Sequence, residues 1–192
     1  ILLSVSPTPV FETGRRMSLR RLYEASPLGC VGTFLVGGVY ALIFGMAAVY
    51  GTRAGLTTAE ISIFIGAIYV GGLVMQYPIG WISDRMDRRW LIFMVTAVGA
   101  GASIAAAALS ASFVAMVVAA VLIGGTANPL YSLLVAYTND YLEPEDMASA
   151  AGGLIVLNGI GATGMPIIAG YAMDLVGPDG FLLCLAVLMG VL

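Results

Sequence analysis

Five apolar runs, each of about twenty residues or more, follow one another along this chain with short polar segments between them. A helix needs roughly 20 residues to cross the hydrocarbon core of a bilayer, which is about 30 Å thick. Charged residues make up only 10% of the 192 residues, whereas a soluble domain carries about 25%. Because so few charges cannot cover a globular surface, the sequence predicts an all-α integral membrane protein.

The apolar runs also predict where the helices lie. The five spans are expected at about 28–50, 57–82, 90–110, 112–138 and 144–173. Thr57 and Glu60 have the spacing of a capping box, and Pro144 is placed for a first helical turn. A last run at 181–192 has only 12 residues, about 18 Å as a helix, which is too short to span. We therefore expect five full spans and a truncated sixth.

The polar segments divide the chain into three parts. Residues 1–5, "ILLSV", are expected to end a preceding transmembrane helix. Residues 6–27 form a polar, basic segment with three prolines and are expected to be an interdomain linker, followed by a transmembrane bundle at 28–192. Because apolar residues stand at both ends, we expect the chain to be a fragment of a longer protein.

The basic residues predict the orientation. All eight are arginine, and two crossings separate the group before the first span from the group after the second. Seven therefore share one side of the membrane, and only Arg53 lies opposite. By the positive-inside rule this arginine-rich side, with the linker and the 83–89 loop, is expected in the cytoplasm.

The loop after the second span carries a motif. In "GWISDRMDRR" the pattern G-x-x-x-D-R-x-x-R-R is matched by Gly80, Asp84, Arg85, Arg88 and Arg89. This resembles the signature loop of the major facilitator superfamily (MFS), which follows its second and eighth helices. One departure is Asp87, because the family loop usually carries glycine there.

The resemblance extends over nearly the whole chain. "QYPIGWISDRMDRR" and "LYSLLVAYTNDYLEPEDMASAAGGLIVLNGIGATGMPIIAG" are similar to the YcaD-like branch of bacterial transporters. The basic segment before the first span resembles the linker between the two six-helix halves of the superfamily. The resemblance therefore implies the C-terminal half of a 12-helix transporter, with helices seven to eleven complete and the twelfth cut short.

The charged loop has two interpretations. Gly80 lacks a Cβ, so the second span can press on a neighbouring helix. Asp84 can accept hydrogen bonds from Arg88 or face the N-terminus of a helix in the other half, a conformational latch that contributes up to ~2 kcal/mol. Alternatively, the arginines only anchor the topology against anionic lipid. We favour the latch for Asp84 and the anchor for Arg89 and Arg85.

Polar residues near the middle of the spans are candidates for a substrate cavity. In the fourth span Pro129 removes one backbone hydrogen bond and frees the carbonyl of Gly125, so a helix break is expected at Gly124, Gly125 and Pro129. Freed backbone groups at that depth must be buried in protein or face water. The candidate cavity residues are Tyr40, Phe44, Gln76, Asn128, Tyr131 and Asn158. The alternative is ordinary interhelical hydrogen bonding. We favour this alternative for Gln76 and the cavity for Asn128, Tyr131 and Tyr40.

The fifth span offers a weaker pattern. Gly152, Gly161, Pro166 and Gly170 have a spacing similar to the antiporter motif of the superfamily, although Met165 and Ala169 replace two of its glycines. Close helix packing with a proline kink explains the same residues equally well.

Several activities are not expected. The sequence has no histidine, and its two cysteines lie far apart in apolar runs, so we expect no metal, no cofactor and no enzyme activity. No charged residue lies at mid-span, which favours a neutral or amphipathic solute. A proton-coupled carrier needs a titratable group inside the membrane, and in that case its carboxylate is expected in the missing half.

These observations predict a secondary transporter of the bacterial inner membrane that moves a small solute by alternating access. We expect efflux, with proton coupling left open; uptake of a small nutrient and a non-transporting receptor or scaffold are the alternatives. The expected partners are the solute, the lipid bilayer and an N-terminal six-helix half, and no nucleic acid.

Overall fold

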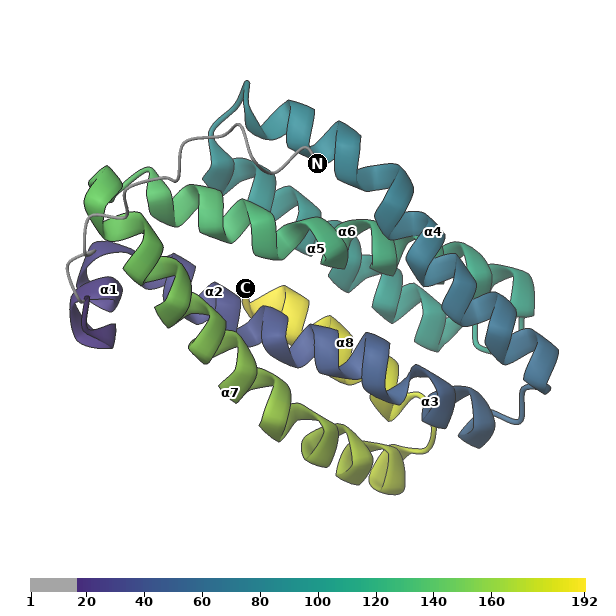
Figure 1. Cartoon of the computed structure of the whole chain (residues 1–192). Helices are drawn as coiled ribbons and strands as arrows, with labels where there is room; N and C mark the ends of the chain where they lie inside the picture. Colours follow the sequence, from purple (N-terminus) through teal and green to yellow (C-terminus); the bar gives the residue numbers. More distant parts are fainter. Residues whose placement is uncertain (1–16) are drawn as a thin grey trace, which may run out of the picture.

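The computed structural model describes residues 17–192, which form helices joined by short connections (Figure 1). No strand occurs within this part of the chain, and the predicted all-α fold is confirmed. The elements are α1 (Leu19–Ala25), α2 (Pro27–Tyr40), the π-helix η2 (Ala41–Met46), α3 (Ala47–Arg53), α4 (Thr58–Ser83), α5 (Arg88–Ala108), α6 (Phe113–Asn139), α7 (Pro144–Val176) and α8 (Gly180–Val191). The predicted end of a preceding helix at 1–5 and linker residues 6–16 lie outside the described residues.

Five helical segments are long and apolar enough to cross a membrane, as the sequence predicted. Helices α4, α5, α6 and α7 supply one each, and α2, η2 and α3 together form the first, Pro27–Arg53. The last helix, α8, has 12 residues and ends partway along the bundle in Figure 1. The membrane-spanning architecture therefore follows from the lengths of the apolar runs.

Local sequence sets several of the helix ends. At the start of α4, the Thr57 side chain accepts a hydrogen bond from the Glu60 backbone N–H, and the Glu60 carboxylate accepts one from the Thr57 N–H. This is the predicted capping box. Pro144 occupies the first turn of α7, also as predicted. After α7 the chain turns at Gly177, whose φ of 82° favours glycine, and α8 starts at Gly180.

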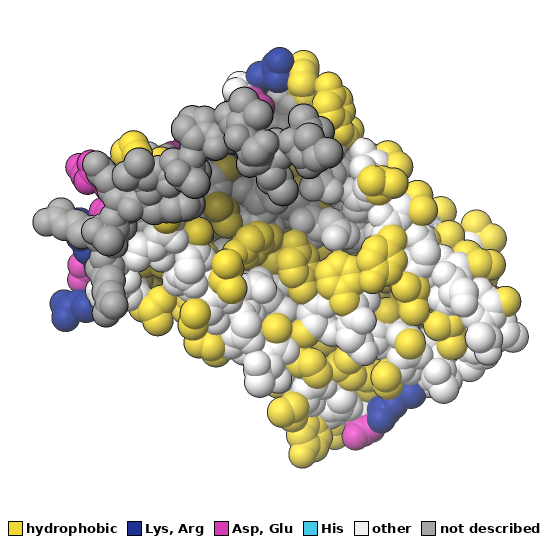
Figure 2. All heavy atoms as spheres, viewed as in Figure 1, with side chains coloured by type: hydrophobic (Ala, Val, Ile, Leu, Met, Phe, Trp, Pro, Cys, Tyr) yellow, Lys and Arg dark blue, Asp and Glu magenta, His cyan; other side chains and the backbone are white. Residues whose placement is uncertain are grey.

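The long helices form two groups that lie side by side. In Figure 1, α4, α5 and α6 lie in the upper group and α2, α7 and α8 in the lower one. Helix α6 packs on α4 and α5, α2 packs on α7 and α8, and the groups meet where α6 contacts α2 and α5 contacts α8. Figure 2 shows charged side chains gathered at the ends of the molecule, with hydrophobic and uncharged groups between them.

The interface between α4 and α6 depends on glycine. Gly71 of α4 faces the backbone carbonyl of Val121, and Gly124 of α6 faces the carbonyl of Ile68. A Cβ at either glycine would lie less than 3.0 Å from the opposite oxygen. Because only glycine permits this approach, small residues hold the two helices at close range.

Helix α6 runs without interruption through Pro129, so the predicted helix break at this site is wrong. Proline removes a single backbone hydrogen bond, and packing on both flanks holds the helix together. Gly124 and Gly125 are buried against α4 and do not line a break. The hydroxyl of Thr126 bonds back to the Leu122 carbonyl at 2.8 Å in its own helix.

Candidate functional site

The ends of the helices bring charged groups from two connections together. The Arg88 guanidinium forms an ion pair with Asp140, at the end of α6, and its Nε donates to the Ser83 hydroxyl at 3.3 Å. At the other end of the bundle, Arg53 pairs with Asp174. We call the first end the arginine-rich end, because it carries Arg20, Arg21, Arg85, Arg88 and Arg89.

Asp84 lies at the C-terminal cap of α4, where its backbone N–H bonds to the Gly80 carbonyl at 3.3 Å. The predicted hydrogen bond between Arg88 and Asp84 is wrong, because the Arg88 side chain reaches Asp140 and Ser83 instead. The exposed Asp84 carboxylate accepts no hydrogen bond from residues 17–192. It also faces the negative end of its own helix, which is unfavourable for an anion.

The other two arginines of the loop contact aromatic side chains. Arg85 donates to the Trp81 carbonyl at 2.9 Å, and its guanidinium lies 3.9 Å from the Trp81 ring centroid. Arg89 donates to the hydroxyl of Tyr137 at 3.1 Å and to that of Tyr141. Arginine beside Trp and Tyr is typical of the boundary between membrane and water.

Asp87 occupies the position where the resembled loop usually carries glycine, and it is the N-cap of α5. Its side chain accepts a hydrogen bond from the Arg89 backbone N–H at 2.8 Å. Aspartate is among the best N-cap residues, so this departure from the pattern has a local structural reason.

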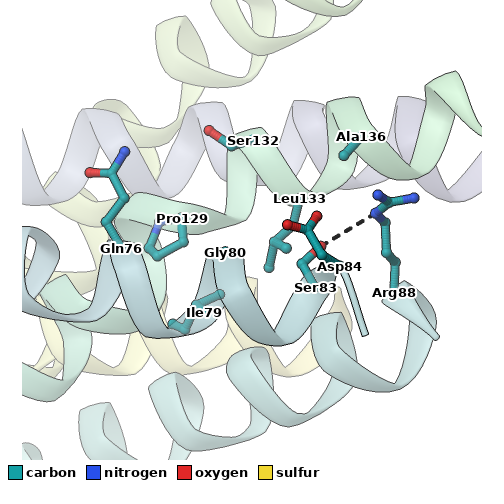
Figure 3. A pocket seen from close by; sticks show the side chains of 10 residues that line it. All are labelled: Gln76, Ile79, Gly80, Ser83, Asp84, Arg88, Pro129, Ser132, Leu133 and Ala136. Atoms are coloured by element: carbon teal, nitrogen blue, oxygen red, sulfur yellow. Dashed lines mark hydrogen bonds between the residues drawn. The ribbon is translucent and has the colours of Figure 1, made fainter. Parts of the chain in front are cut away.

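A pocket of about 310 Å³ lies between α4 and α6 and reaches the charged loop. Figure 3 shows Gln76 and Pro129 at one end and Asp84 and Arg88 at the other. Gly80 lies between them, and a Cβ built there meets no atom within 4 Å, so within residues 17–192 it does not pack on another helix as predicted. The remaining lining residues are Ile79, Ser83, Ser132, Leu133 and Ala136.

Of the six predicted cavity residues, five lie outside this pocket: Tyr40, Phe44, Asn128, Tyr131 and Asn158. The Tyr40 hydroxyl donates to the Asn128 backbone carbonyl at 2.9 Å and so links α2 to α6. The Asn128 side chain donates to the Gly124 carbonyl of its own helix at 2.9 Å. Tyr131, like Asn128, is half-buried. Of the predicted polar residues, Gln76 is therefore the one that lines the pocket, and the interhelical bond predicted for it is not formed within residues 17–192.

The first span contains a π-helical turn, η2, that the sequence did not predict. Phe44 lies within it, and its ring centroid is 5.5 Å from that of Tyr40 and 5.5 Å from that of Tyr69 on α4. We call Tyr40, Phe44 and Tyr69 the aromatic row. It joins the α2 group of helices to the α4 group.

In α7, Asn158 and Gly161 contact α2. The Asn158 amide donates to the Thr33 carbonyl at 3.1 Å, which gives Asn158 an interhelical bond in place of the predicted cavity position. Gly161 lies against the Phe34 carbonyl, and Gly37 of α2 lies against the Asn158 carbonyl.

The other three residues of the predicted pattern in the fifth span behave differently, and a Cβ built at Gly152 meets no atom within 4 Å among the described residues. Helix α7 continues through Pro166 without ending. A Cβ built at Gly170 meets no atom within 4 Å among the described residues, so Gly170 does not share the close contact that Gly161 makes.

Helix α1 docks on α7 at the arginine-rich end, a contact that the sequence did not predict. Arg21 donates to the buried Asp146 carboxylate at 3.4 Å. Leu22 is buried in a small cluster with Cys30, Ala150 and Leu154. Arg21 and Asp146 stand 125 residues apart, so no local pattern could have paired them.

Five spans, a charged loop at one end and a pocket that leads from it between two helices define a multi-pass membrane protein. The family model of the Major Facilitator Superfamily matches residues 29–192, and the chain therefore belongs to this superfamily of transporters. Over 175 residues it is 27% identical to the "Uncharacterized MFS-type transporter YfkF" of Bacillus subtilis (strain 168). The match covers 87% of this chain and 43% of YfkF, so the chain spans less than half of that relative.

Proposed function

We propose that this chain is the C-terminal half of a secondary transporter that moves a small solute across the bacterial inner membrane by alternating access. Within the superfamily, we assign it to the YcaD-like branch. The observation that carries the proposal is the pocket between α4 and α6, which extends from Gln76 and Pro129 to Asp84 and Arg88. A carrier that rocks about a midplane site needs such a path from its centre to one surface.

In the proposed orientation the arginine-rich end lies in the cytoplasm. The ion pair of Arg88 with Asp140 and that of Arg21 with Asp146 lie at the same end. The arginines of the linker and of the loop therefore favour the same orientation under the positive-inside rule. The linker and the 83–89 loop are then cytoplasmic.

Asp84 is proposed as one side of a latch between the two halves. Its carboxylate stands at the unfavourable end of α4 and accepts no hydrogen bond from the described residues. The N-terminus of a helix in the N-terminal half would supply both N–H donors and a favourable dipole, together worth up to ~2 kcal/mol. The latch would hold the cytoplasmic side closed while the other side opens.

We propose proton-coupled efflux of a neutral or amphipathic solute. Along the five spans, the charged side chains of the described residues lie at helix ends, as Glu60 and Asp140 do. An intramembrane titratable group would therefore come from the N-terminal half.

Flux in proteoliposomes tests the transport proposal. The full-length protein is reconstituted, a panel of neutral, amphipathic and charged solutes is offered, and flux is measured with and without an imposed pH gradient. We expect a neutral or amphipathic solute to move against its concentration gradient. Protons that move across the membrane in the opposite direction drive this flux. Nutrient uptake would give flux in the reverse direction, and solute binding without any flux would favour a receptor or scaffold and overturn the proposal.

The latch has its own test in the same preparation. Asp84→Asn is expected to lower the transport rate and to shift the population toward the inward-open state, measured by cysteine accessibility from the cytoplasmic side. Asp87→Asn is the matched control, because it removes one charge from the same loop and keeps a capping oxygen for α5. Equal rates and equal accessibility in the two variants would show that Asp84 is not a latch.

A further inference from the structure

We infer that the aromatic row of Tyr40, Phe44 and Tyr69 is a recognition surface for a flat, uncharged aromatic molecule that carries a hydrogen-bonding group. This inference rests on the proposed function and names the substrate class of the transporter. Its basis is the depth, exposure and stacking of three rings that the sequence scatters over two spans.

The row lies at mid-membrane depth. Tyr40 stands at the middle of the Pro27–Arg53 segment, and Tyr69 stands within two residues of the middle of Thr58–Ser83. Phe44 lies one turn beyond Tyr40. Tyrosine is enriched at the two membrane surfaces, so two tyrosines at this depth need an explanation other than interfacial anchoring.

The rings are partly free, unlike the packed aromatic residues of the core. Phe44 is 45% exposed and Tyr69 is 55% exposed, whereas Tyr50, which stacks on Phe181, is completely buried. The Phe44 and Tyr69 rings are 29° from parallel, a near-stacked arrangement. A further flat ring placed against the exposed faces would continue this stack.

The tyrosine hydroxyls at and near the row differ in whether they have a hydrogen-bond partner. The Tyr40 hydroxyl is bound to the Asn128 carbonyl, but the hydroxyls of Tyr69 and Tyr131 make no hydrogen bond to residues 17–192. A hydroxyl at this depth cannot face hydrocarbon without a large desolvation cost. These groups therefore require a partner that residues 17–192 do not supply, and a hydrogen-bonding substituent on the solute provides one.

The charge of the solute follows from the surroundings. The nearest charged residues along the two spans are Arg53 and Glu60, which lie nine residues from Phe44 and from Tyr69, about 13 Å along a helix. An ionised solute at the row would lose its hydration and find no opposite charge beside it on these two spans. The row therefore favours a neutral molecule.

The π-helical turn supports a role in binding. Such turns are rare and occur often at functional sites, because the widened turn changes the direction of its side chains. Here η2 contains Phe44, the residue that joins Tyr40 to Tyr69. Packing alone does not require this geometry, since Phe44 remains nearly half exposed.

Calorimetric titration of the full-length protein in lipid nanodiscs tests the inference, with empty nanodiscs as the blank for partition into lipid. The probes are 2-naphthol and decahydro-2-naphthol, which have the same carbon skeleton and the same hydroxyl. We expect 2-naphthol to bind about two- to twelvefold more tightly, since aromatic pairing is worth about 0.5–1.5 kcal/mol. Naphthalene-2-carboxylate and naphthylmethylammonium are expected to bind more weakly than 2-naphthol. Equal affinity for the two naphthols would overturn the inference.

Variants locate the binding surface. Phe44→Leu and Tyr69→Leu are each expected to remove the preference for 2-naphthol, whereas Tyr69→Phe keeps the ring and the preference but lowers affinity. The control is Phe93→Leu on α5, where Phe93 is exposed and pairs with Trp90 at 6.0 Å. An unchanged thermal midpoint shows that each variant folds, and loss of the preference in Phe93→Leu would contradict the assignment.

Failure of this inference and failure of the proposed function give different results. A protein that carries other solutes in proteoliposomes but does not distinguish the two naphthols overturns the substrate class alone. A protein that prefers 2-naphthol but moves no solute retains the binding surface and overturns the transport proposal.

Discussion

Substitution of Gly161 by alanine tests whether close backbone contact holds α7 to α2. A Cβ at Gly161 would lie less than 3.0 Å from the Phe34 carbonyl oxygen. The obstacle is backbone, which cannot rotate away as a side chain can, so the helices must separate until this distance passes 3.4 Å. The hydrogen bond from Asn158 to the Thr33 carbonyl, at 3.1 Å, lies one turn away and would lengthen too.

The expected cost follows from three contributions. Overpacking a close interface costs about 1–3 kcal/mol, and loss of an interhelical hydrogen bond in a membrane costs about 0.6 kcal/mol. Replacing glycine by alanine inside a helix stabilises the helix by up to about 1 kcal/mol, which offsets part of this cost. Gly161→Ala should therefore lower the unfolding free energy by about 1–3 kcal/mol. Gly170→Ala, where a Cβ meets no atom within 4 Å, should leave it unchanged or raise it.

The assay is denaturant unfolding of the purified full-length protein in detergent, followed by the fluorescence of its tryptophans. Gly170→Ala is the matched control on the same helix, and Gly101→Ala on α5, which also has open space, is a second control. Gly37→Ala should behave as Gly161→Ala does, because its Cβ would meet the Asn158 carbonyl oxygen. If Gly161→Ala unfolds at the same denaturant concentration as the two controls, the close-contact argument is wrong.

Three further predictions concern the arginine-rich end. Asp87→Ala removes the N-cap of α5 and should cost about 1 kcal/mol of unfolding free energy, measured by denaturant unfolding; Asp87→Asn should not. Arg21→Gln removes the charged partner of the buried Asp146, so amide hydrogen exchange across α1 should become several-fold faster, and unchanged exchange would show that apolar packing alone holds α1. Arg88 and Asp140 are partly exposed, so a double-mutant cycle of Arg88→Gln and Asp140→Asn should give a coupling of about 0.2–1 kcal/mol, and zero coupling would contradict the pair.

Much of the fold could be predicted because span length and helix capping are local properties. An apolar run of about 20 residues is long enough to cross the bilayer core, and this length identifies the five spans. Thr57 and Glu60 form their capping box within four residues of sequence. Asp87 shows the limit of comparison with a family pattern, since the residue that departs from the pattern makes a good helix cap.

The site could be predicted only in part because its contacts join distant segments. Pro129 indicated a break, but the helix survives because neighbouring helices pack on both flanks, a tertiary effect that no local rule includes. Arg88 is one of the two partners that the sequence predicts for Asp84, yet Arg88 pairs with Asp140, 52 residues further on. Gln76 was the polar residue least favoured for the cavity, and it lines the pocket.

The aromatic row lies where the two groups of helices meet. Contacts of glycine against backbone occur within each group, as for Gly71 with Val121 and for Gly161 with Phe34, so each group contains a tight helix pair. Between the two groups, Phe44 stacks on Tyr69, and the Tyr40 hydroxyl donates one hydrogen bond to α6. A flat solute stacked on Phe44 and Tyr69 would touch both groups at once. Because the proposed mechanism moves one six-helix half against the other, such a solute drives the change when its other face also contacts the N-terminal half in one state and not in the other.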